Sequence, residues 1–410
     1  MLNKNRGANS DSLQQMNRSL VLSLMRKSHI TTRADIVKKT GLKGATITNI
    51  VADFIKAGII IETGSVEGEK GRRSIGISLD NDIYQIIAVR ISRLNFKIRI
   101  YSLHGENLYG KSFEIDTNSD VKGIIDSIKL RIQEFLTVFP RKTLAIGIAL
   151  PGPYMKSKNS ILQISDFHGW EGINIAEEIE SEFMIPTAVE HDAKSSALAE
   201  WWYGSYEHTS SILLNIIAGQ GNGVGVISNG KILSGAHGTA GELGHCSIFF
   251  DGPLCDCGNH GCLDLYCSSR ILKKNVKEKI KDMPDYYLFD KQINEETLAS
   301  AVQKGDPLVI EEVRKISKYL GYGIVNAINI YDPDLIVIGD ELANIGKNIL
   351  LDEIRTIVHE RVLPGLSGEV KIVLSKLQEP ILLGAMTVAM DKVFHEMKFM
   401  EKEISKEEKV

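Results

Sequence analysis

The sequence predicts a winged helix-turn-helix domain followed by a two-lobed α/β body that carries a zinc-binding loop. Three observations lead to this fold class. Two short amphipathic helices and a β-hairpin stand near the start of the chain, two successive α/β units follow them, and all five cysteines fall within residues 241–267. At 410 residues, the chain is long enough for two or three domains with a large hydrophobic core.

Charge is distributed unevenly along the chain. The first 80 residues contain 13 Lys and Arg against 7 Asp and Glu, a net charge of +6, whereas the whole chain carries −4, which leaves −10 for the rest. A basic first fifth on an acidic body indicates a nucleic-acid-binding module joined to a different domain. The sequence contains neither the apolar segment of a signal peptide nor a membrane span of about 18 apolar residues. The protein is therefore expected to be cytoplasmic, with no membrane partner.

Residues 1–80 follow the pattern of a winged helix-turn-helix domain. Thr31 or Thr32 can cap a first helix, Gly41 ends it, and a second helix covers about residues 44–57. Two β segments around a charged tip follow the second helix. This order of elements predicts a DNA-binding module with a hairpin wing.

The second helix would enter the major groove of DNA by its N-terminal end. Hydroxyls and an amide can reach base edges there, a lysine suits phosphate, and wing arginines can contact the backbone or the minor groove. The residues expected to contact DNA are Lys43, Thr46, Thr48, Asn49, Arg72 and Arg73. A winged module can also bind protein, but the basic balance favours DNA.

The rest of the chain predicts two α/β lobes with a ligand cleft between them. The first lobe, residues 81–190, opens with two long strands and is completed by a helix at about 381–397. The second lobe, residues 191–380, contains a helix of small residues, a strand pair around the glycine run 219–225, and the cysteine-rich loop.

The cysteine-rich loop has the spacing of a zinc site. Its ligands would be His245, Cys255, Cys257 and Cys262, in which the histidine lies 10 residues before a C-x-C-x4-C cluster. Three thiolates and one imidazole make a closed tetrahedral shell for a structural zinc ion. Disulfides or buried thiols are the alternatives, and nothing marks the chain as secreted. Cys246 and Cys267 are expected to be buried as small hydrophobic residues.

These motifs together resemble the ROK family of repressors and sugar kinases. The matching stretches are GELGH at 241–245, CDCGNHGCLD at 255–264, HDAKSSALAE at 191–200, the glycine run AGQGNGVG and the wing end GRRSIGI at 71–77. The chain looks most like the repressor branch, such as xylose and N-acetylglucosamine repressors, over nearly its whole length. The resemblance implies an actin-like, ribonuclease-H-like pair of lobes, a structural zinc, a sugar in the cleft, dimerisation helices in the second lobe, and a homodimer or a tetramer.

The resemblance also implies a sugar site. The positions concerned are Asp166, Asp192, Glu242, His245 and Asp264, of which Asp192 falls where the kinases of the family keep their catalytic base. Carboxylates and an imidazole suit sugar hydroxyls, which both donate and accept hydrogen bonds. If His245 binds zinc through one ring nitrogen, its other nitrogen can face the sugar. Each acid could instead be a surface charge or a helix cap.

Three departures separate the chain from the kinases it resembles. Those enzymes share a D-x-G-G-T turn that cradles ATP phosphates, whereas residues 90–94 are RISRL and offer no glycine for close approach. Gln220 replaces a usual hydroxyl residue, and Asp340 replaces a glycine with a carboxylate that would repel phosphate. The sequence therefore predicts no catalysis and no ATP. An ATP-dependent sugar kinase with an accessory N-terminal domain is the alternative, and a DNA-tethered sensor of a partner protein is a third.

The expected protein is a sugar-responsive repressor. A dimer would bind a roughly palindromic operator, and the sugar would change the spacing of the two winged modules. His191 and Lys194 replace asparagines common in the family, and Asp264 replaces a longer glutamate, so the sugar stays open and need not be a simple hexose. The operator, and whether the ligand releases or promotes DNA binding, also stay open.

Overall fold

The computed structural model describes residues 10–67, 73–116, 119–155, 158, 160–161, 169–206, 211–366 and 368–396. Contacts between residues divide the chain into two compact units. The first unit comprises Met1–Leu150, Asn174–Glu190 and Ala385–Val410, and the second comprises Pro151–Ile173 and His191–Gly384. The N-terminal module thus belongs to the same unit as the first α/β sheet.

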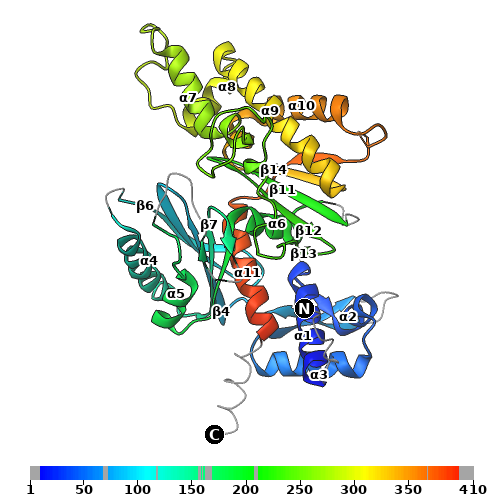
Figure 1. Ribbon diagram of the computed structural model, residues 1–410. Helices are drawn as coiled ribbons and strands as arrows, with labels where there is room; N and C mark the ends of the chain where they lie inside the picture. Colours follow the sequence, from blue (N-terminus) through cyan, green and yellow to red (C-terminus); the bar gives the residue numbers. More distant parts are fainter. Residues whose placement is uncertain are drawn as a thin grey trace. The chain divides into compact units, whose positions relative to one another are not determined.

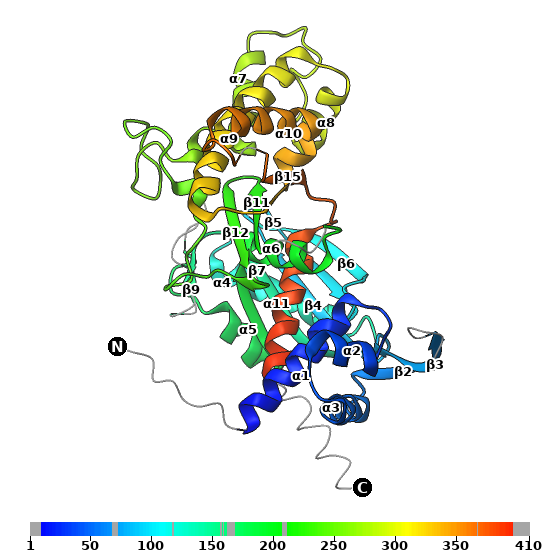
Figure 2. The ribbon, with the colours of Figure 1, turned by 90° about the vertical axis from the view of Figure 1, so that its right-hand side faces the viewer.

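The N-terminal part of the first unit is a helix-turn-helix with a β-hairpin (Figures 1 and 2). Its elements are α1 (Ser10–Lys27), β1 (Thr31–Thr32), α2 (Arg33–Thr40), α3 (Gly44–Lys56), β2 (Ile60–Glu67) and β3 (Arg73–Leu79). The Thr32 side chain caps α2 by accepting from the backbone N–H of Asp35, and the Asp35 carboxylate accepts from the backbone of Thr32 in return. Gly41 then ends α2 with a φ of 70°, a left-handed conformation that glycine adopts readily.

The remainder of the first unit is a five-stranded sheet in the order β10-β7-β4-β5-β6. Its elements are β4 (Tyr84–Ile91), β5 (Asn95–Tyr101), β6 (Asn107–Glu114), α4 (Val121–Leu136), β7 (Lys142–Leu150), α5 (Ile175–Phe183), β10 (Thr187–His191) and α11 (Pro380–Glu396). Strands β4, β5 and β6 form an antiparallel meander, and β7 runs parallel to β4. The inner strands β4 and β7 are almost continuously apolar because both of their faces are buried.

The second unit repeats this arrangement with the sheet order β13-β12-β11-β14-β15. Its strands are β8 (Tyr154–Met155), β9 (Ser160–Ile161), β11 (Ile212–Ala218), β12 (Asn222–Ser228), β13 (Lys231–Ile232), β14 (Leu335–Gly339) and β15 (Lys371–Leu374). Its helices are α6 (Asp192–Tyr203), α7 (Ser269–Ile280), α8 (Glu295–Gln303), α9 (Pro307–Tyr331) and α10 (Glu341–Arg361). Again three antiparallel strands precede parallel ones, since β11 pairs antiparallel with β12 and parallel with β14. Two sheets of the same order confirm the prediction of two α/β lobes.

The two faces of the second sheet are covered differently (Figure 1). On one face Leu214 and Ile216 join a large apolar core with α7, α8, α9 and α10. On the other face, a methyl group on Gly225 would lie 2.2 Å from the carbonyl oxygen of Ala193. Glycines on β12 and small residues on α6 therefore let this helix lie directly against the strand.

Most predicted boundaries agree with the structure to within a few residues. Asp306 caps α9 and Pro307 is its first residue, where the missing N–H of proline costs no hydrogen bond. Helix α4 begins at Val121, after the Asp120 cap, and ends at Leu136. None of the described helices combines the length and the hydropathy needed to cross a bilayer.

The core around α9 allows a matched test of stability. Ile316 is 1% exposed inside the core, whereas Ile330 on the same helix is 69% exposed. Ile316→Ala should lower the free energy of unfolding by about 2–5 kcal/mol, and Ile330→Ala by less than about 0.5 kcal/mol. Urea denaturation of the two variants measures the difference, and equal losses would contradict this description of the core.

Candidate functional site

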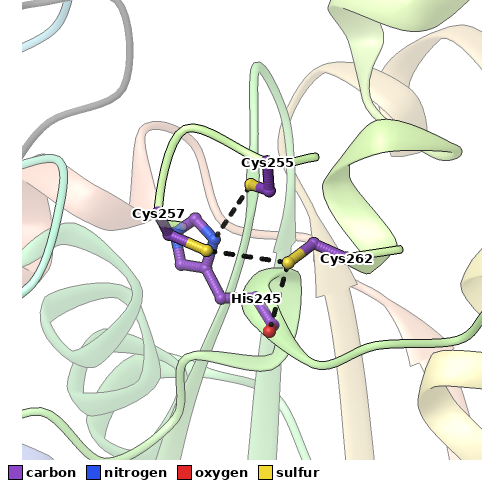
Figure 3. A group of neighbouring side chains, drawn as sticks. All are labelled: His245, Cys255, Cys257 and Cys262. Atoms are coloured by element: carbon purple, nitrogen blue, oxygen red, sulfur yellow. Dashed lines mark hydrogen bonds between the residues drawn. The ribbon is translucent and has the colours of Figure 1, made fainter. Parts of the chain in front are cut away.

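Four side chains of the second unit converge on one point, as Figure 3 shows. One ligand atom from each of His245, Cys255, Cys257 and Cys262 lies within 4.8 Å of the other three. The Sγ atoms of Cys257 and Cys262 are 3.7 Å apart, and Cys255 Sγ lies 3.8 Å from Nδ1 of His245. A tetrahedral zinc ion with Zn–S distances of about 2.3 Å requires sulfur–sulfur edges of about 3.8 Å. All five cysteines are free thiols, so the donor set fits a zinc ion and the disulfide alternative is wrong.

Close backbone approaches shape the loop that carries these donors. A methyl group on Gly261 would lie 1.6 Å from the carbonyl oxygen of Phe249, so only glycine fits there. The side-chain amide of Asn259 donates to the carbonyl oxygen of His245 over 3.1 Å, and the backbone N–H of Cys255 donates to Asn259 over 2.8 Å. These bonds fold the loop back over His245.

The protonation state of the thiols would depend on whether a cation is bound. Burial and the neighbouring thiols raise the pKa of Cys262 to about 12, and burial also raises the pKa of Cys255. Thiols with raised pKa values keep their protons at neutral pH unless a cation stabilises the thiolates. Metal binding would therefore release protons and weaken as the pH falls.

Asp264 joins this loop to the glycine turn between β11 and β12. Its Oδ1 atom accepts two hydrogen bonds of 2.8 Å from Asn222, one from the backbone N–H and one from the side-chain amide. A methyl group on Gly221 or Gly244 would lie within 3 Å of the same carboxylate, at 2.9 and 2.5 Å. Burial raises the pKa of Asp264, while the hydrogen bonds from Asn222 and the nearby His245 oppose this shift. Asp264 thus holds the turn against the GELGH segment.

Two buried acceptors, one in the GELGH segment and one just after the glycine turn, have no hydrogen-bond partner among the described residues. They are Oε1 of Glu242 and Oδ1 of Asn222. An unsatisfied buried polar atom costs about 1–3 kcal/mol. A ligand with hydroxyl or amide donors would remove that cost.

The start of α6 lies against β12 at Gly223, the residue after Asn222. Asp192 is the first residue of α6 and is only partly exposed, and its Oδ1 atom lies 3.2 Å from Nε2 of His191. A methyl group on Gly223, at the start of β12, would lie 3.3 Å from Cε1 of His191. Neighbouring residues of β12 therefore contact both His191 and Asp264. The described sugar-site candidates lie in one unit, while Asp166 lies outside the described residues.

The candidate DNA contacts are on the surface of the N-terminal module. Lys43 precedes α3 and is exposed, as are Thr48 and Asn49 on its first turns, whereas Thr46 is partly buried. Thr48 also donates its hydroxyl to the carbonyl oxygen of Gly44 over 2.9 Å. Arg73 is exposed at the start of β3, and Arg72 lies outside the described residues.

The two cysteines outside the cluster, Cys246 and Cys267, differ in burial. Cys267 is fully buried, as predicted, but the prediction for Cys246 was wrong, because its side chain is exposed. Cys246 directly follows the short 3-10 turn Leu243–His245, where the chain leaves the protein interior. Sequence reasoning missed Asn222 altogether. The signal available was a lone amide between two glycines of the run AGQGNGVG.

The two turns that depart from the kinase pattern are filled by the chain itself. In the second unit, a methyl group on Gly219 would lie 2.6 Å from Oδ2 of Asp340, so this carboxylate lies against the glycine backbone. In the first unit, the backbone N–H and the hydroxyl of Ser92 both donate to the carbonyl oxygen of Asn95 over 2.8 Å, which closes the β4–β5 turn on itself. Neither turn presents the open glycine backbone that cradles phosphate.

Comparisons with known proteins by sequence and by structure point to the same family. Residues 86–392 match the ROK family. The chain is 27% identical over 385 residues to a xylose repressor of Caldicellulosiruptor bescii, covering 92% of this chain and 96% of the relative. It is 28% identical over 381 residues to the DNA-binding transcriptional dual regulator NagC of Escherichia coli, covering 92% and 93%. Among solved structures, a ROK family transcriptional regulator homologous to the E. coli MLC protein superposes with a TM-score of 0.80 at 27% identity, covering 96% of this chain and all of that one.

The cysteine loop allows a matched test of metal binding. Cys257→Ser should lose zinc, because it removes one of the four donors of the cluster. Cys246→Ser removes a neighbouring exposed thiol outside the cluster and should keep one zinc per chain. Elemental analysis of both purified variants provides the measurement. Equal zinc contents would refute the assignment of donors.

Proposed function

The chain belongs to the ROK family, and we propose that it is a sugar-responsive transcriptional regulator, a repressor that binds a palindromic operator as a homodimer in the cytoplasm. The observation that carries this proposal is a winged helix-turn-helix whose exposed α3 end bears Lys43, Thr48 and Asn49, joined to a ROK body. Polar side chains at the start of such a helix suit readout of base edges in the major groove. Two half-sites one helical turn apart call for a two-fold dimer.

We propose that the effector binds beside the glycine turn of the second unit. The buried acceptors of Glu242 and Asn222 suit donated hydroxyls, and Asp192 begins the helix that lies against Gly223, the next residue of β12. The relatives named for xylose and N-acetylglucosamine support a sugar or a sugar derivative. Asp264 acts here through its hydrogen bonds to Asn222, so it orders the site and leaves only Oδ2 for a ligand.

A structural zinc ion would complete the second unit. His245, Cys255, Cys257 and Cys262 would hold it and close its coordination shell, which leaves no position for a reacting water. When bound, it would fix the loop and orient the His245 ring next to Asp264.

The alternative is an ATP-dependent sugar kinase of the same family. Asp192 favours it, because the position matches the base of the kinases. The carboxylate of Asp340 on Gly219 disfavours it, because a carboxylate in a phosphate turn repels the nucleotide. A coupled assay with ATP and a panel of hexoses, pentoses and amino sugars decides between the two functions. Turnover that Asp192→Asn abolishes would establish the kinase, whereas sugar-dependent release or binding of DNA without turnover would establish the regulator.

The wing arginines test the DNA interface. Replacing Arg72 and Arg73 by Ala should weaken binding to an operator fragment and lower the slope of log affinity against log salt by about 1–2, since each phosphate contact contributes about 0.9. Fluorescence anisotropy at several salt concentrations gives that slope. Arg131→Ala, on α4 outside the N-terminal module, is the control and should leave the slope unchanged. An unaltered slope in the double variant would show that the wing arginines do not contact DNA phosphates.

Glu242 tests the effector site. Glu242→Gln should lower the affinity for the bound sugar by about tenfold or more, because a hydrogen bond to a charged acceptor contributes about 1.5–3 kcal/mol. Folding and DNA binding should persist, because the lost acceptor has no partner within the described chain. Thermal shift against a sugar panel measures the effect, since a ligand that binds only the folded state raises its stability. Equal shifts for the variant and the unmodified protein would remove Glu242 from the site.

A further inference from the structure

Helix α11 runs through the point at which the two units divide. Pro380 to Gly384 count with the second unit, and Ala385 to Glu396 count with the first. The helix is continuous over these 17 residues and spans about 25 Å. A single rigid element therefore carries contacts that belong to both units.

The first turns of α11 are tied to α6 within the second unit. A methyl group on Gly384 would lie 1.9 Å from the carbonyl oxygen of Ser195, so the helices touch backbone to backbone. Farther along α6, the buried Glu200 accepts hydrogen bonds from Tyr206, over 2.9 Å, and from Ser375. Ser375 belongs to the segment that leads into α11. Because α6 begins at Asp192, this tie reaches the proposed effector site.

The later turns of α11 are tied to α1 within the first unit, where both views show the two helices side by side (Figures 1 and 2). Asp391 pairs with Arg26, whose side chain is only 1% exposed. The side-chain amide of Gln15 donates to the carbonyl oxygen of His395. Arg26 is buried and Asp391 is partly exposed, so the pair anchors a buried guanidinium of α1 to α11.

Helix α1 is in turn held against α3, the helix expected to contact DNA. Arg18 of α1 pairs with Asp53 of α3. The carbonyl oxygen of Ala57, just after α3, also accepts a buried hydrogen bond of 2.9 Å from the Tyr84 hydroxyl. The contacts therefore run from α6 to α11, from α11 to α1, and from α1 to α3.

We propose that α11 transmits effector occupancy at the start of α6 to the winged module, with the Arg26–Asp391 pair as the point at which it holds α1. The inference rests on the proposed function. A sugar that binds two arrangements of α6 unequally shifts their populations. The contact at Gly384 leaves no space for α6 to move without α11, and the Arg26–Asp391 pair makes α1 follow.

The test compares two ion pairs of the first unit in the full-length protein. Asp391→Asn breaks the pair with Arg26, whereas Glu178→Gln breaks the Lys129–Glu178 pair of 2.7 Å between α4 and α5. The probes are D-xylose and N-acetyl-D-glucosamine, and the DNA is a fragment selected from a random pool by the unmodified protein. Allosteric coupling commonly changes affinity by about 5–150-fold. Asp391→Asn should bind the sugar as the unmodified protein does but reduce the sugar-induced change in DNA affinity to less than about twofold, and Glu178→Gln should keep the full change. A full change in Asp391→Asn would overturn the inference.

A second measurement needs neither sugar nor DNA. Gly384→Ala forces α6 and α11 apart, so it should speed amide hydrogen exchange across α1 in the folded protein. Gly123→Ala, on α4, meets only the Asp120 and Ser119 side chains at the start of its own helix, at 3.2 Å or more, and should leave α1 unchanged. If Gly384→Ala does not fold, Ser375→Ala loosens the same tie by removing a hydrogen bond to Glu200. Unchanged exchange in α1 would overturn the inference, whereas an unmodified protein that binds neither DNA nor sugar would overturn only the proposed function.

Discussion

The candidate site of the second unit depends on the hydrogen bonds between Asp264 and Asn222. One carboxylate oxygen accepts both bonds, and the glycine backbones at 221 and 244 leave it just enough space. The residue before it, Leu263, contacts α9 so closely that a methyl group on Gly323 would lie 2.5 Å away. The glycine turn, the metal loop and the apolar core thus meet at one acidic side chain. Any rearrangement of the loop would therefore change the proposed ligand site as well.

The distance along the chain between contacting residues explains which features the sequence could predict. The cap of α2 by Thr32, the start of α9 at Asp306 and the four metal donors follow from residues close together in the chain, where spacing alone carries the information. Asn222 could not be found in this way, because its partner Asp264 is 42 residues distant. The exposure of Cys246 also depends on where the chain turns outward in three dimensions. Local signals therefore predicted the elements and the donor set, whereas tertiary contacts decided how the site is ordered.

The two units share one sheet order but carry different features. The first unit combines its sheet with the N-terminal module, and its β4–β5 turn is closed by Ser92 and Asn95. The second unit contains the metal donors, the unsatisfied acceptors and α6. Under the proposed function, Asp340 fills the Gly219 end of the glycine turn of the second unit, while Asp264 orders its Gly221 end, so one turn can be closed to phosphate and still border an effector site.

The backbone at Asp340 is strained, and this strain bears on whether the turn could accept a phosphate. Its φ of 73° and ψ of −164° lie in a region that favours glycine, which costs a non-glycine residue about 1–3 kcal/mol. A return to glycine would relieve that strain in one step. It would not reopen the β4–β5 turn, where Arg90, Ser92 and Arg93 would each have to change as well. Under the proposed function, a nucleotide site would thus require several substitutions, of which only the one at Asp340 would bring a benefit by itself, so these turns would make a gain of phosphate binding improbable in evolution.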